Sequence, residues 1–486
     1  MAFLEILESI RQTVQSYLSE NNLGMTNFTV EPSKPGFGDI TCNVAFLLSK
    51  ELHKSPQDIS KEIVSFCSEK TSEEIKHVIA HPAGHINFEI DYTRFNKFVL
   101  LESIKPTYAD IDIGNSSKII VEHTSVNPNK ALHIGHIRNI VIGDIISRIL
   151  KKVNYNVKVL NYIDDSGLQV ADLIIGFKHC GFSQEPPNNE KFDHYCGDTV
   201  YVGTTEKYND DKDLESKRHE ILKSIEDVNS DVSKFAQKIT RSVLAAQLKT
   251  VWELGVTYDC LNFESQIIHS KLWEKIFSKL KSQNLVRLEK TGKNQGCWVI
   301  SSPNEEDKIL VRSNGVATYI AKDIPYAAWK LGIIDDPFNY EIYTTQENSQ
   351  TLYETTLDEA HEHDYDKPVF SGDKVITVID NRQIRLQKIV TDLMKHFTGN
   401  DSYVHLGYES VTLSASTASN LGLKTSEKSV QMSGRKGFYV DADLILENLH
   451  TKIYNESKKR NDSLSESELN SIAKSVSVGT IRYEMI

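Results

Sequence analysis

The stretch that decides the fold runs from Val121 to Asn139 and reads VEHTSVNPNKALHIGHIRN. It begins inside a β-rich run, KIIVEHT at 118–124, and continues through the turn formers Asn127 and Pro128. It ends inside GHIRNIVIGDIISRILKKV at 135–153, where apolar residues recur every four positions and predict a helix. A second strand-like run, VKVLNYI at 157–163, follows. We therefore predict a strand, loop, helix and strand with a right-handed crossover.

The sequence before this unit predicts a separate α+β domain. Helical patterns at 3–18 and 55–70 flank a turn-rich stretch, EPSKPGFGDI at 31–40, and HINFEID at 85–91 predicts a strand. The stretch PTYADIDIGNSS at 106–117 is typical of a linker. A chain of 486 residues is long enough for about three domains.

The sequence after the unit predicts the rest of an α/β domain and a helical end. We expect a first domain at 1–112, a second at 113–425 and a helical region at 426–486, with an insertion in the second domain at about 170–300. In KILVRSNGVATYIAKD at 308–323, Asn-Gly between two strand-like runs predicts a hairpin. KVITVID at 374–380 predicts another buried strand.

Composition narrows the functional class. The chain is 39% hydrophobic, and 55 Lys and Arg against 67 Asp and Glu give it a net charge of −12. The net charge therefore gives no argument for binding of nucleic acid, and we expect no DNA partner. No apolar run approaches the length of a membrane helix, and Glu5 and Glu8 exclude a signal peptide, so we expect no membrane association. Six scattered cysteines without a CxxC pair are typical of free thiols in a reducing cytosol and predict a cytoplasmic protein without a metal site.

The string His133-Ile134-Gly135-His136 lies at the predicted junction of strand, loop and helix, where open α/β sheets bind ligands. The start of a helix offers unpaired N–H groups to phosphate, and Gly135 allows close backbone approach. Two imidazoles can donate hydrogen bonds to phosphoryl oxygens as charge develops. The alternatives are a helix cap that happens to contain histidines and, less favoured because no third ligand is near, a zinc site.

A second string, Gln431-Met432-Ser433-Gly434-Arg435-Lys436-Gly437, combines two glycines with positive charge that suits a phosphate. Taken alone, the string is more typical of a solvated basic turn. Strings of the GxGxxG and GxxxxGK[ST] types are absent from the sequence, which argues against a dinucleotide dehydrogenase and a P-loop NTPase.

Together the two strings resemble the signatures of class I aminoacyl-tRNA synthetases. VEHTSVNPNKALHIGHIRN and MSGRKG are similar to the corresponding regions of arginyl-tRNA synthetases, and SNGVATYIAKDIPYA is similar to their arginine-pocket segment. GDITCNVAFLLSK and AGHINFEI resemble the N-terminal additional domain of that family, and SVGTIRYEMI resembles the junction before its C-terminal helical domain. The resemblance covers nearly the whole chain in order.

The resemblance implies an α/β fold: a Rossmann-like parallel-sheet catalytic domain with an insertion, after a tRNA-contacting α+β domain and before a helical stem. It implies a ligase that activates L-arginine with ATP, with Mg²⁺ carried mainly by the ATP phosphates, and transfers arginine to the 3′ end of tRNA(Arg). It also implies that activation needs bound tRNA. We expect a monomer.

The resemblance also assigns roles to residues. The implied ATP site comprises His133, Gly135, His136, Met432, Ser433 and Arg435, and the implied catalytic groups are Lys130, His133, His136 and Lys436. The implied arginine site comprises Glu122, Ser125, Asn127, His136, Tyr319 and Asp323. In the first domain, Phe37 and Asn43 are candidates for tRNA contact.

Three of these assignments compete with simpler interpretations. A carboxylate such as Asp323 can take a guanidinium through paired charge-assisted hydrogen bonds, which lysine cannot reproduce. Asp323 also suits a helix N-cap ahead of Pro325. Tyr319 is otherwise a half-buried strand residue, and Glu122 is otherwise a paired carboxylate at the end of a strand.

The chain departs from the family pattern in two ways. The usual second signature, KMSKS, has lysine at its first and fourth places, where this chain has Gln431 and Gly434. Enzymes that resemble this chain often supply a lysine before HIGH, and Lys130 lies three residues before His133, although it also suits a solvated loop. The resemblance also leads us to expect an anticodon-binding helical domain after the position of Ile486, where the sequence stops. Two alternatives therefore stay open: a synthetase for another amino acid, and a non-catalytic paralogue that binds tRNA or a protein.

Overall fold

The computed structural model describes residues 2–24, 27–108, 110–301, 307–315, 318, 320–358, 366–420, 429–431, 439–461 and 463–486. The chain forms two compact units, Met1–Ile111 and Asp112–Ile486. Among the described residues, no helix combines the length and the apolar character needed to cross a membrane.

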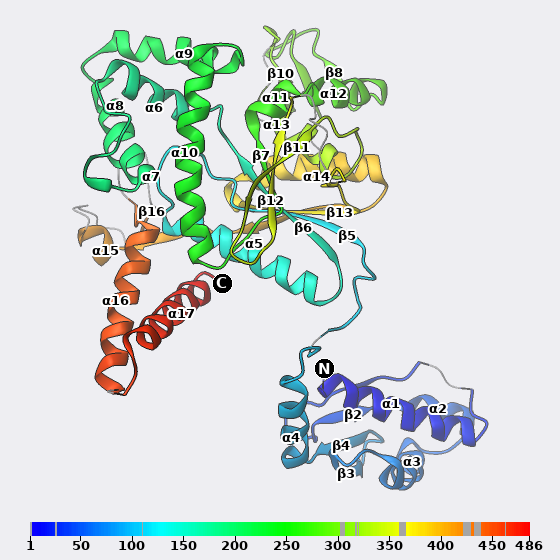
Figure 1. Cartoon of the computed structure of the whole chain (residues 1–486). Helices are drawn as coiled ribbons and strands as arrows, with labels where there is room; N and C mark the ends of the chain where they lie inside the picture. Colours follow the sequence, from blue (N-terminus) through cyan, green and yellow to red (C-terminus); the bar gives the residue numbers. More distant parts are fainter. Residues whose placement is uncertain are drawn as a thin grey trace. The chain divides into compact units, whose positions relative to one another are not determined.

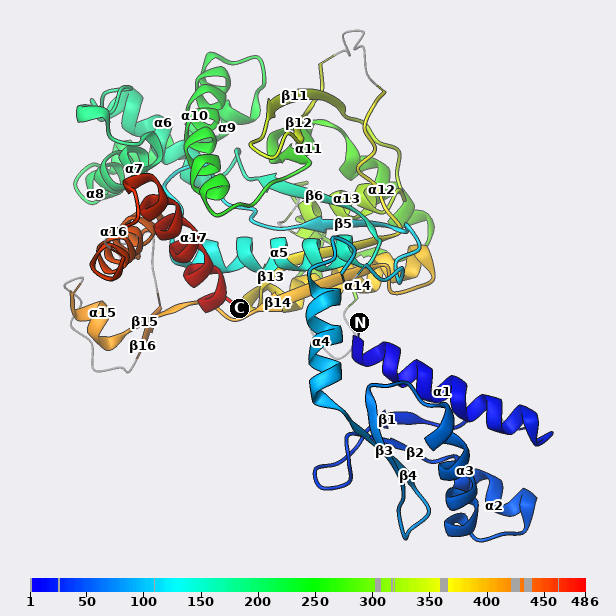
Figure 2. The ribbon, with the colours of Figure 1, turned by 60° about the horizontal axis from the view of Figure 1, so that its bottom comes forward.

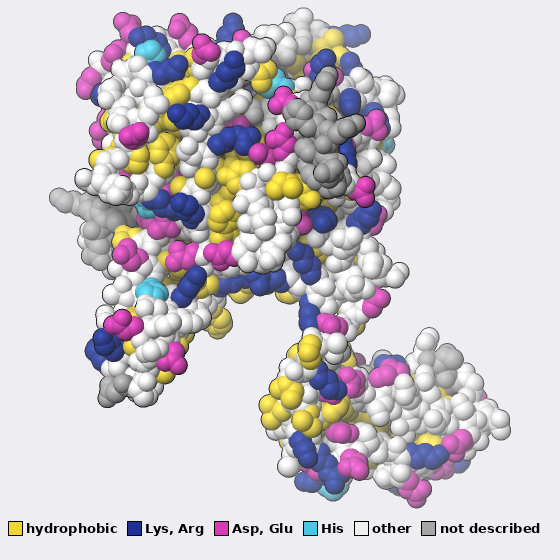
Figure 3. Space-filling view, viewed as in Figure 1, with side chains coloured by type: hydrophobic (Ala, Val, Ile, Leu, Met, Phe, Trp, Pro, Cys, Tyr) yellow, Lys and Arg dark blue, Asp and Glu magenta, His cyan; other side chains and the backbone are white. Residues whose placement is uncertain are grey.

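The first unit is an α+β domain built on a four-stranded antiparallel sheet in the order β1-β2-β4-β3. Its elements are α1 (Ala2–Glu20), β1 (Val30–Pro32), β2 (Ile40–Cys42), α2 (Val44–Leu52), α3 (Pro56–Lys70), β3 (Ile75–Ala80), β4 (Ile86–Ile90) and α4 (Tyr92–Ser103). Ser55 caps α3 by accepting a hydrogen bond from the Asp58 amide, with Pro56 in the first turn. Exposed apolar side chains gather on the α4 side of this unit, among them Leu100, Leu101 and Ile104 (Figure 3).

The second unit is built around a seven-stranded sheet in the order β11-β12-β7-β6-β5-β13-β14 (Figures 1 and 2). The strands are β5 (Lys118–Glu122), β6 (Asn156–Ile163), β7 (Cys260–Phe263), β11 (Asn339–Thr345), β12 (Thr351–Thr356), β13 (Lys374–Asp380) and β14 (Tyr403–Tyr408). All neighbouring pairs are parallel except β11 with β12 at one edge. The predicted α/β class with a parallel sheet is confirmed, as are the strands expected at 118–124, 157–163 and 374–380.

The order of the strands places the ligand site. From β5 the chain moves outward through β6 and β7, and it returns to the other side of β5 with β13 and β14. The strand order therefore reverses between β5 and β13. In open α/β sheets, the crevice outside the carboxyl ends of the strands at such a reversal binds ligand. The carboxyl ends here are Glu122 and Asp380.

Helices cover both faces of this sheet because its central strands are apolar on both faces. Ile119 and Val121 of β5 point to the face covered by α5 (Ile134–Lys152) and the end of α10 (Asp231–Glu253). Ile120 points to the opposite face, covered by α12 (Leu272–Ser282), α13 (Ile320–Lys330) and α14 (Ile384–Thr398). The alternation along one strand thus supplies two separate cores.

The single insertion predicted at about 170–300 is too broad, because strand β7 lies within that range and pairs with β6 in the sheet. A helical block fills the connection from β6 to β7: α6 (Leu168–His179), η1 (Pro187–Asn189), α7 (Phe192–His194), the π-helical turn η2 (Tyr195–Tyr201), α8 (Val202–Lys207), α9 (Lys212–Glu226) and α10. A second excursion follows β7 and contains α11 (Glu264–His269), α12 and the small antiparallel sheet of β8 (Val286–Leu288), β9 (Trp298–Ile300) and β10 (Lys308–Val311). Four residues of strand, CLNF, were too short a pattern to predict β7.

The second arm of the hairpin predicted around Asn314-Gly315 lies mostly outside the described residues, but the Thr318 amide donates a hydrogen bond to the Leu310 carbonyl at 2.8 Å across the turn. Strand β10 precedes the turn and pairs with β9, whereas α13 follows it from Ile320. Packing supports the helix from Ile320 onward, because Ile320 and Ile324 are buried in the core with residues of β5 and α14.

The remaining elements lie towards the end of the chain. They are η3 (Asn381–Gln383), β15 (Thr412–Ser414), α15 (Ala415–Asn420), β16 (Ser429–Gln431), α16 (Ala442–Arg460) and α17 (Glu466–Glu484). Helices α16 and α17 form the expected helical stem, and Ser465 and Glu468 cap the start of α17 reciprocally. The stem packs on the rest of the second unit, where Ile481 is buried in the same core as α5.

Candidate active site

The two histidines of the HIGH string cap the start of helix α5. His133 is the N-cap residue, and its Nδ1 accepts a hydrogen bond from the His136 amide at 3.3 Å. His136 Nδ1 in turn accepts from the His133 amide at 3.2 Å, and the two rings stack with their centroids 3.5 Å apart. The two side chains thus form a reciprocal capping box in which histidine replaces the usual serine and glutamate. The helix-cap interpretation and the phosphate interpretation therefore concern the same two residues.

The capping geometry sets the protonation of both imidazoles. Burial, together with the nearby Lys130 ammonium, lowers the pKa of His133 to about 3. Burial also holds the pKa of His136 well below its ordinary value. Both rings are neutral at pH 7, and because each Nδ1 accepts a backbone hydrogen bond, each proton lies on Nε2. Each ring therefore offers one Nε2–H donor and no charge.

A cavity of about 580 Å³ opens at the strand reversal beside this cap. We call it the acidic cavity because its wall includes the carboxyl groups of Glu122, Asp164, Glu264, Asp323 and Asp380. Five residues of the predicted arginine site line it: Glu122, Ser125, Asn127, His136 and Asp323. They come from the end of β5, the following loop, the first turn of α5 and the first turn of α13. The fold therefore gathers residues that are up to two hundred positions apart.

Asp323 lies inside the first turn of α13, so it is not the N-cap residue of that helix. Burial, reinforced by the negative charges of Glu122 and Glu264, raises the pKa of Asp323 to about 7. Gln387 of α14 donates a weak hydrogen bond to it at 3.4 Å. A carboxyl group held at this pKa in a cavity gains from a cation, because the cation restores its ionised form.

Glu122 faces the same cavity and is also paired with a cation. Both interpretations of Glu122, as a residue of the arginine site and as a paired carboxylate at the end of a strand, therefore describe part of its environment. The Lys330 ammonium forms a buried ion pair with Glu122, and the two side chains are only 1% and 7% exposed. Ser125 donates to the other carboxylate oxygen of Glu122 at 3.4 Å. Glu122 thus pairs directly with a cation, whereas the hydrogen bond to Asp323 comes from the neutral amide of Gln387.

A smaller cavity of about 180 Å³ lies on the other side of the cap. His133 and Gly135 line it together with Arg382 and Ser410. His136, Asp380 and Tyr408 line both this cavity and the acidic cavity. The two spaces therefore meet at His136, which places an acid-rich site directly beside two imidazole donors at a helix start.

Comparison with known proteins agrees with this geometry. Residues 99–357 match the family model described as tRNA synthetases class I (R), catalytic domain. Residues 4–90 match the model described as arginyl tRNA synthetase N terminal domain. The chain belongs to the arginyl-tRNA synthetase family.

Several relatives of this family are similar over most of the chain. The arginine–tRNA ligase of Thermococcus sibiricus is 32% identical over 93% of this chain and 70% of its own length. That of Pyrococcus furiosus is 32% identical over 94% of this chain and 72% of its own. The solved arginyl-tRNA synthetase of Thermus thermophilus superposes with a TM-score of 0.72 at 28% identity, covering 99% of this chain and 75% of that one.

Some residues around the arginyl-tRNA synthetase site were missed from the sequence. Glu264 accepts hydrogen bonds from Tyr162 at 2.6 Å and from Ser166 at 2.5 Å, and it pairs with Lys322. Asp164 accepts a hydrogen bond from Asn127 at 2.7 Å, and burial with the neighbouring Glu264 raises its pKa to about 6. One signal was available: Glu264 comes directly after β7, and Asp164 comes directly after β6, at the sheet edge where ligands bind.

Other predicted residues of the family site are placed differently or not described. Lys130 lines neither cavity; its ammonium lies 5.5 Å from the centre of the Tyr439 ring. Tyr319, Met432, Ser433, Arg435 and Lys436 lie outside the described residues. In the first unit, the exposed Phe37 ring contacts His81 with centroids 5.3 Å apart, and Asn43 accepts a hydrogen bond from the Thr29 amide.

Proposed function

We propose that this chain is an arginine–tRNA ligase that activates L-arginine with ATP and transfers arginine to tRNA(Arg). The observation that carries this conclusion is the acidic cavity, which meets the imidazole-capped start of α5 at His136. A cationic amino acid and a nucleotide phosphate would find complementary walls on the two sides of one residue. The relatives described above carry the same activity in their names.

We propose that Asp323 binds the guanidinium group of arginine. Its buried carboxyl group has a raised pKa and lies at the wall of the cavity, so a cation bound there lowers the pKa and forms charge-assisted hydrogen bonds. Each such bond is worth about 1.5–3 kcal/mol. Ser125 and Asn127, which line the same cavity, would position the α-amino and carboxylate groups of the substrate.

We propose that His133 and His136 stabilise the phosphates of ATP. In the activation step a carboxylate oxygen of arginine attacks the α-phosphorus, a new P–O bond forms, and the bond to the leaving diphosphate breaks. The two Nε2–H groups donate hydrogen bonds to oxygens that gain negative charge in the transition state. Because the rings are already neutral and fixed by their caps, this step needs positioning and no proton transfer from histidine.

Further features complete the proposal. Mg²⁺ enters with the ATP phosphates, activation needs bound tRNA, and the 3′-terminal adenosine accepts arginine in the second step. The N-terminal unit contacts tRNA, with Phe37 and Asn43 as candidates. The division at 1–112, 113–425 and 426–486 stays a prediction, as do a monomeric state and a cytoplasmic location.

Amino-acid-dependent exchange between ATP and diphosphate tests this function. Exchange is measured with arginine, lysine or glutamate, each with and without tRNA. Exchange with arginine alone among the three, and only with tRNA, is the expected result. Equal exchange with lysine would identify a synthetase for another amino acid. If no exchange occurs and neither ATP nor arginine raises the melting temperature of the protein, a non-catalytic paralogue would be favoured.

A further inference from the structure

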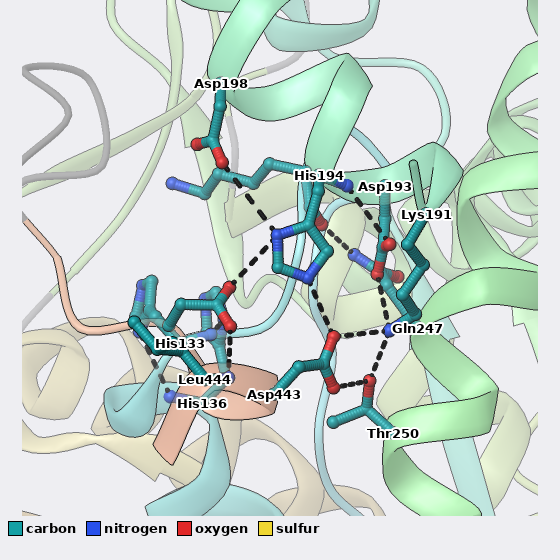
Figure 4. Close-up of polar contacts among 12 residues, drawn as sticks. His133, His136, Lys191, Asp193, His194, Asp198, Gln247, Thr250, Asp443 and Leu444 are labelled. Carbon is teal, nitrogen blue, oxygen red and sulfur yellow. Dashed lines mark hydrogen bonds and ion pairs between the residues drawn. The ribbon is translucent and has the colours of Figure 1, made fainter. Parts of the chain in front are cut away.

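A second group of charged side chains lies outside both cavities, around His194 (Figure 4). His194 Nε2 is 2.8 Å from a carboxylate oxygen of Asp443, and its Nδ1 is 3.5 Å from Asp441 and 3.9 Å from Asp198. The Lys191 ammonium lies 2.6 Å from the same Asp443 oxygen, and Thr250 donates to the other oxygen at 2.6 Å. We call this group the His194 clamp; it consists of Lys191, His194, Asp198, Thr250, Asp441 and Asp443.

The clamp joins two parts of the second unit that are far apart in the sequence. Lys191, His194 and Asp198 belong to the helical block after β6, at α7 and η2, whereas Asp441 and Asp443 belong to the start of α16. Asp441 is also the N-cap of α16 and accepts a hydrogen bond from the Leu444 amide at 2.9 Å. Tyr439, just before it, donates to Asp198. Side chains therefore bind the segment 439–443 to the helical block.

The other side of the same segment is bound to the HIGH string by backbone hydrogen bonds. The Ile134 amide donates to the Val440 carbonyl at 3.0 Å, and the Ala442 amide donates to the Leu132 carbonyl at 3.0 Å. His133 and Asp441 form an isolated antiparallel bridge. The clamp therefore lies one peptide segment away from the cap that fixes both imidazoles.

We propose that His194 is a positioning residue of the nucleotide site: by gripping Asp443, it holds the segment 439–443 against the start of α5. The segment makes its backbone bonds on the α5 side, so its place relative to the helical block depends on these side-chain contacts. When the contact between His194 and Asp443 is lost, the segment 439–443 can shift, and the backbone around His133 shifts with it. The arginine end of the acidic cavity, at Asp323 and Glu264, has no residue in the clamp and keeps its geometry.

A metal ion is the competing interpretation of these residues. Ligand atoms of His194, Asp441 and Asp443 lie within 4.8 Å of one another, which is close enough to hold an ion. The Lys191 ammonium, however, already lies beside Asp443 and beside Asp193 at 3.2 Å. The chain thus supplies its own positive charge here, and we favour the clamp.

The test measures ATP binding and arginine binding separately, by calorimetry on the full chain. We expect His194→Ala to weaken ATP binding at least tenfold and to change arginine affinity less than twofold. His194→Arg, which restores a cation between the carboxylates, should recover part of the loss. His450→Ala is the matched control, because His450 lies on α16 and borders the same surface hollow as His194 outside the clamp.

Three results would overturn the proposal: unchanged ATP affinity in folded His194→Ala, equal loss of both ligands, or an equal effect of the control. If His194→Ala does not fold, His194→Gln, which keeps a hydrogen-bond donor without the charge, takes its place with the same expectations. Stabilisation of wild type by Zn²⁺ or Mn²⁺ that His194→Ala abolishes would favour the metal instead. This inference rests on the proposed function, but ATP binding is measured without any catalytic step. If the wild-type protein shows no ATP–diphosphate exchange, that result counts against the proposed function, and the effect of His194 on ATP binding can still be tested.

Discussion

The acidic cavity and the His194 clamp both gather charged side chains, but the pKa of Asp323 in the cavity and the pKa of Asp443 in the clamp shift in opposite directions. In the cavity, burial beside other carboxylates raises the pKa of Asp323 to about 7 and of Asp164 to about 6. In the clamp, the Asp198 and Asp443 carboxylates raise the pKa of His194 to about 10. Burial alone would raise the pKa of Asp443, but hydrogen bonds from His194 and Lys191 outweigh it and lower that pKa well below its usual range.

The difference separates a ligand site from a structural contact. Carboxyl groups that face a cavity without enough positive charge are destabilised in their ionised form, and a cationic ligand relieves that cost. Carboxylates that already face lysine and histidine gain nothing from a ligand, and they hold two chain segments together instead. The shift of a pKa, read with the partner that causes it, thus distinguishes the two regions.

The largest expected effect comes from removing the carboxylate that receives arginine. Asp323→Asn should lower kcat/KM for arginine in ATP–diphosphate exchange by about 100-fold or more, because it removes charge-assisted hydrogen bonds worth about 1.5–3 kcal/mol each. KM for ATP should change little. Asp335→Asn is a matched control, since Asp335 is an exposed residue of the loop between α13 and β11 and does not line the acidic cavity. Arginine use that survives Asp323→Asn unchanged would mean that the pocket is wrongly assigned.

The next effect concerns the phosphate side. Lys130 lines neither cavity, but its charge acts on both imidazoles, and we propose that it contacts a phosphate of bound ATP. Lys130→Ala should then slow activation by about 10- to 150-fold, the value of one charge-assisted contact of about 1.5–3 kcal/mol, while arginine binding stays within twofold. Pre-steady-state measurement of adenylate formation, beside equilibrium arginine binding, separates the two. Equal losses in both would refute a role for Lys130 at the phosphates.

A smaller effect follows from the pKa of Asp323. Between about pH 4 and pH 7 the folded, ligand-free protein holds a proton on Asp323 that the unfolded chain has lost, so this group makes stability fall as pH rises through that window. Bound arginine reverses the penalty. The increase in melting temperature caused by arginine should therefore be larger at pH 8 than at pH 6, and KM for arginine about tenfold lower at pH 8. A pH dependence that persists in Asp323→Asn would assign the titration to another group.

The smallest expected effect is a change in melting temperature, which should have opposite signs for variants in the two regions. Asp443→Asn removes the shared partner of His194 and Lys191 and should lower the melting temperature by about 2 to 8 °C. Asp323→Asn removes a buried carboxyl group of raised pKa and should leave the ligand-free melting temperature unchanged or higher at pH 8. Differential scanning calorimetry of both variants without ligands measures whether the melting temperature falls or rises relative to the wild-type protein. A lower melting temperature for both would remove the distinction.

The start of the site was predictable because its signals are local. Strand β5, the turn at Asn127 and Pro128, and helix α5 follow one another within 35 residues, and each has its own periodicity or turn chemistry. These local patterns predicted the elements that carry Glu122, Asn127 and His136, and the family resemblance assigned the three residues to one site. Asp323 was assigned by family resemblance, although the end of the strand-like run expected to contain it is helical from Ile320.

The rest depends on contacts that no local pattern records. Lys330 reaches Glu122 across 208 positions, and His194 reaches Asp443 across 249. Glu264 was missed because the four-residue strand before it has too little pattern to be recognised inside a charged region. Such pairs are decided by the order of strands in the sheet and by helix packing, which sequence periodicity does not specify.

The central claim is that the acidic cavity lacks one positive charge that arginine supplies. Calorimetric binding of L-arginine and of L-citrulline, its neutral isostere, tests this claim most directly, because the two ligands differ in shape only at one atom and differ in charge by one unit. We predict that at pH 8 arginine binds at least 100-fold more tightly than citrulline and that Asp323→Asn removes most of this preference. Equal affinities for the two ligands in the wild-type protein would contradict the account.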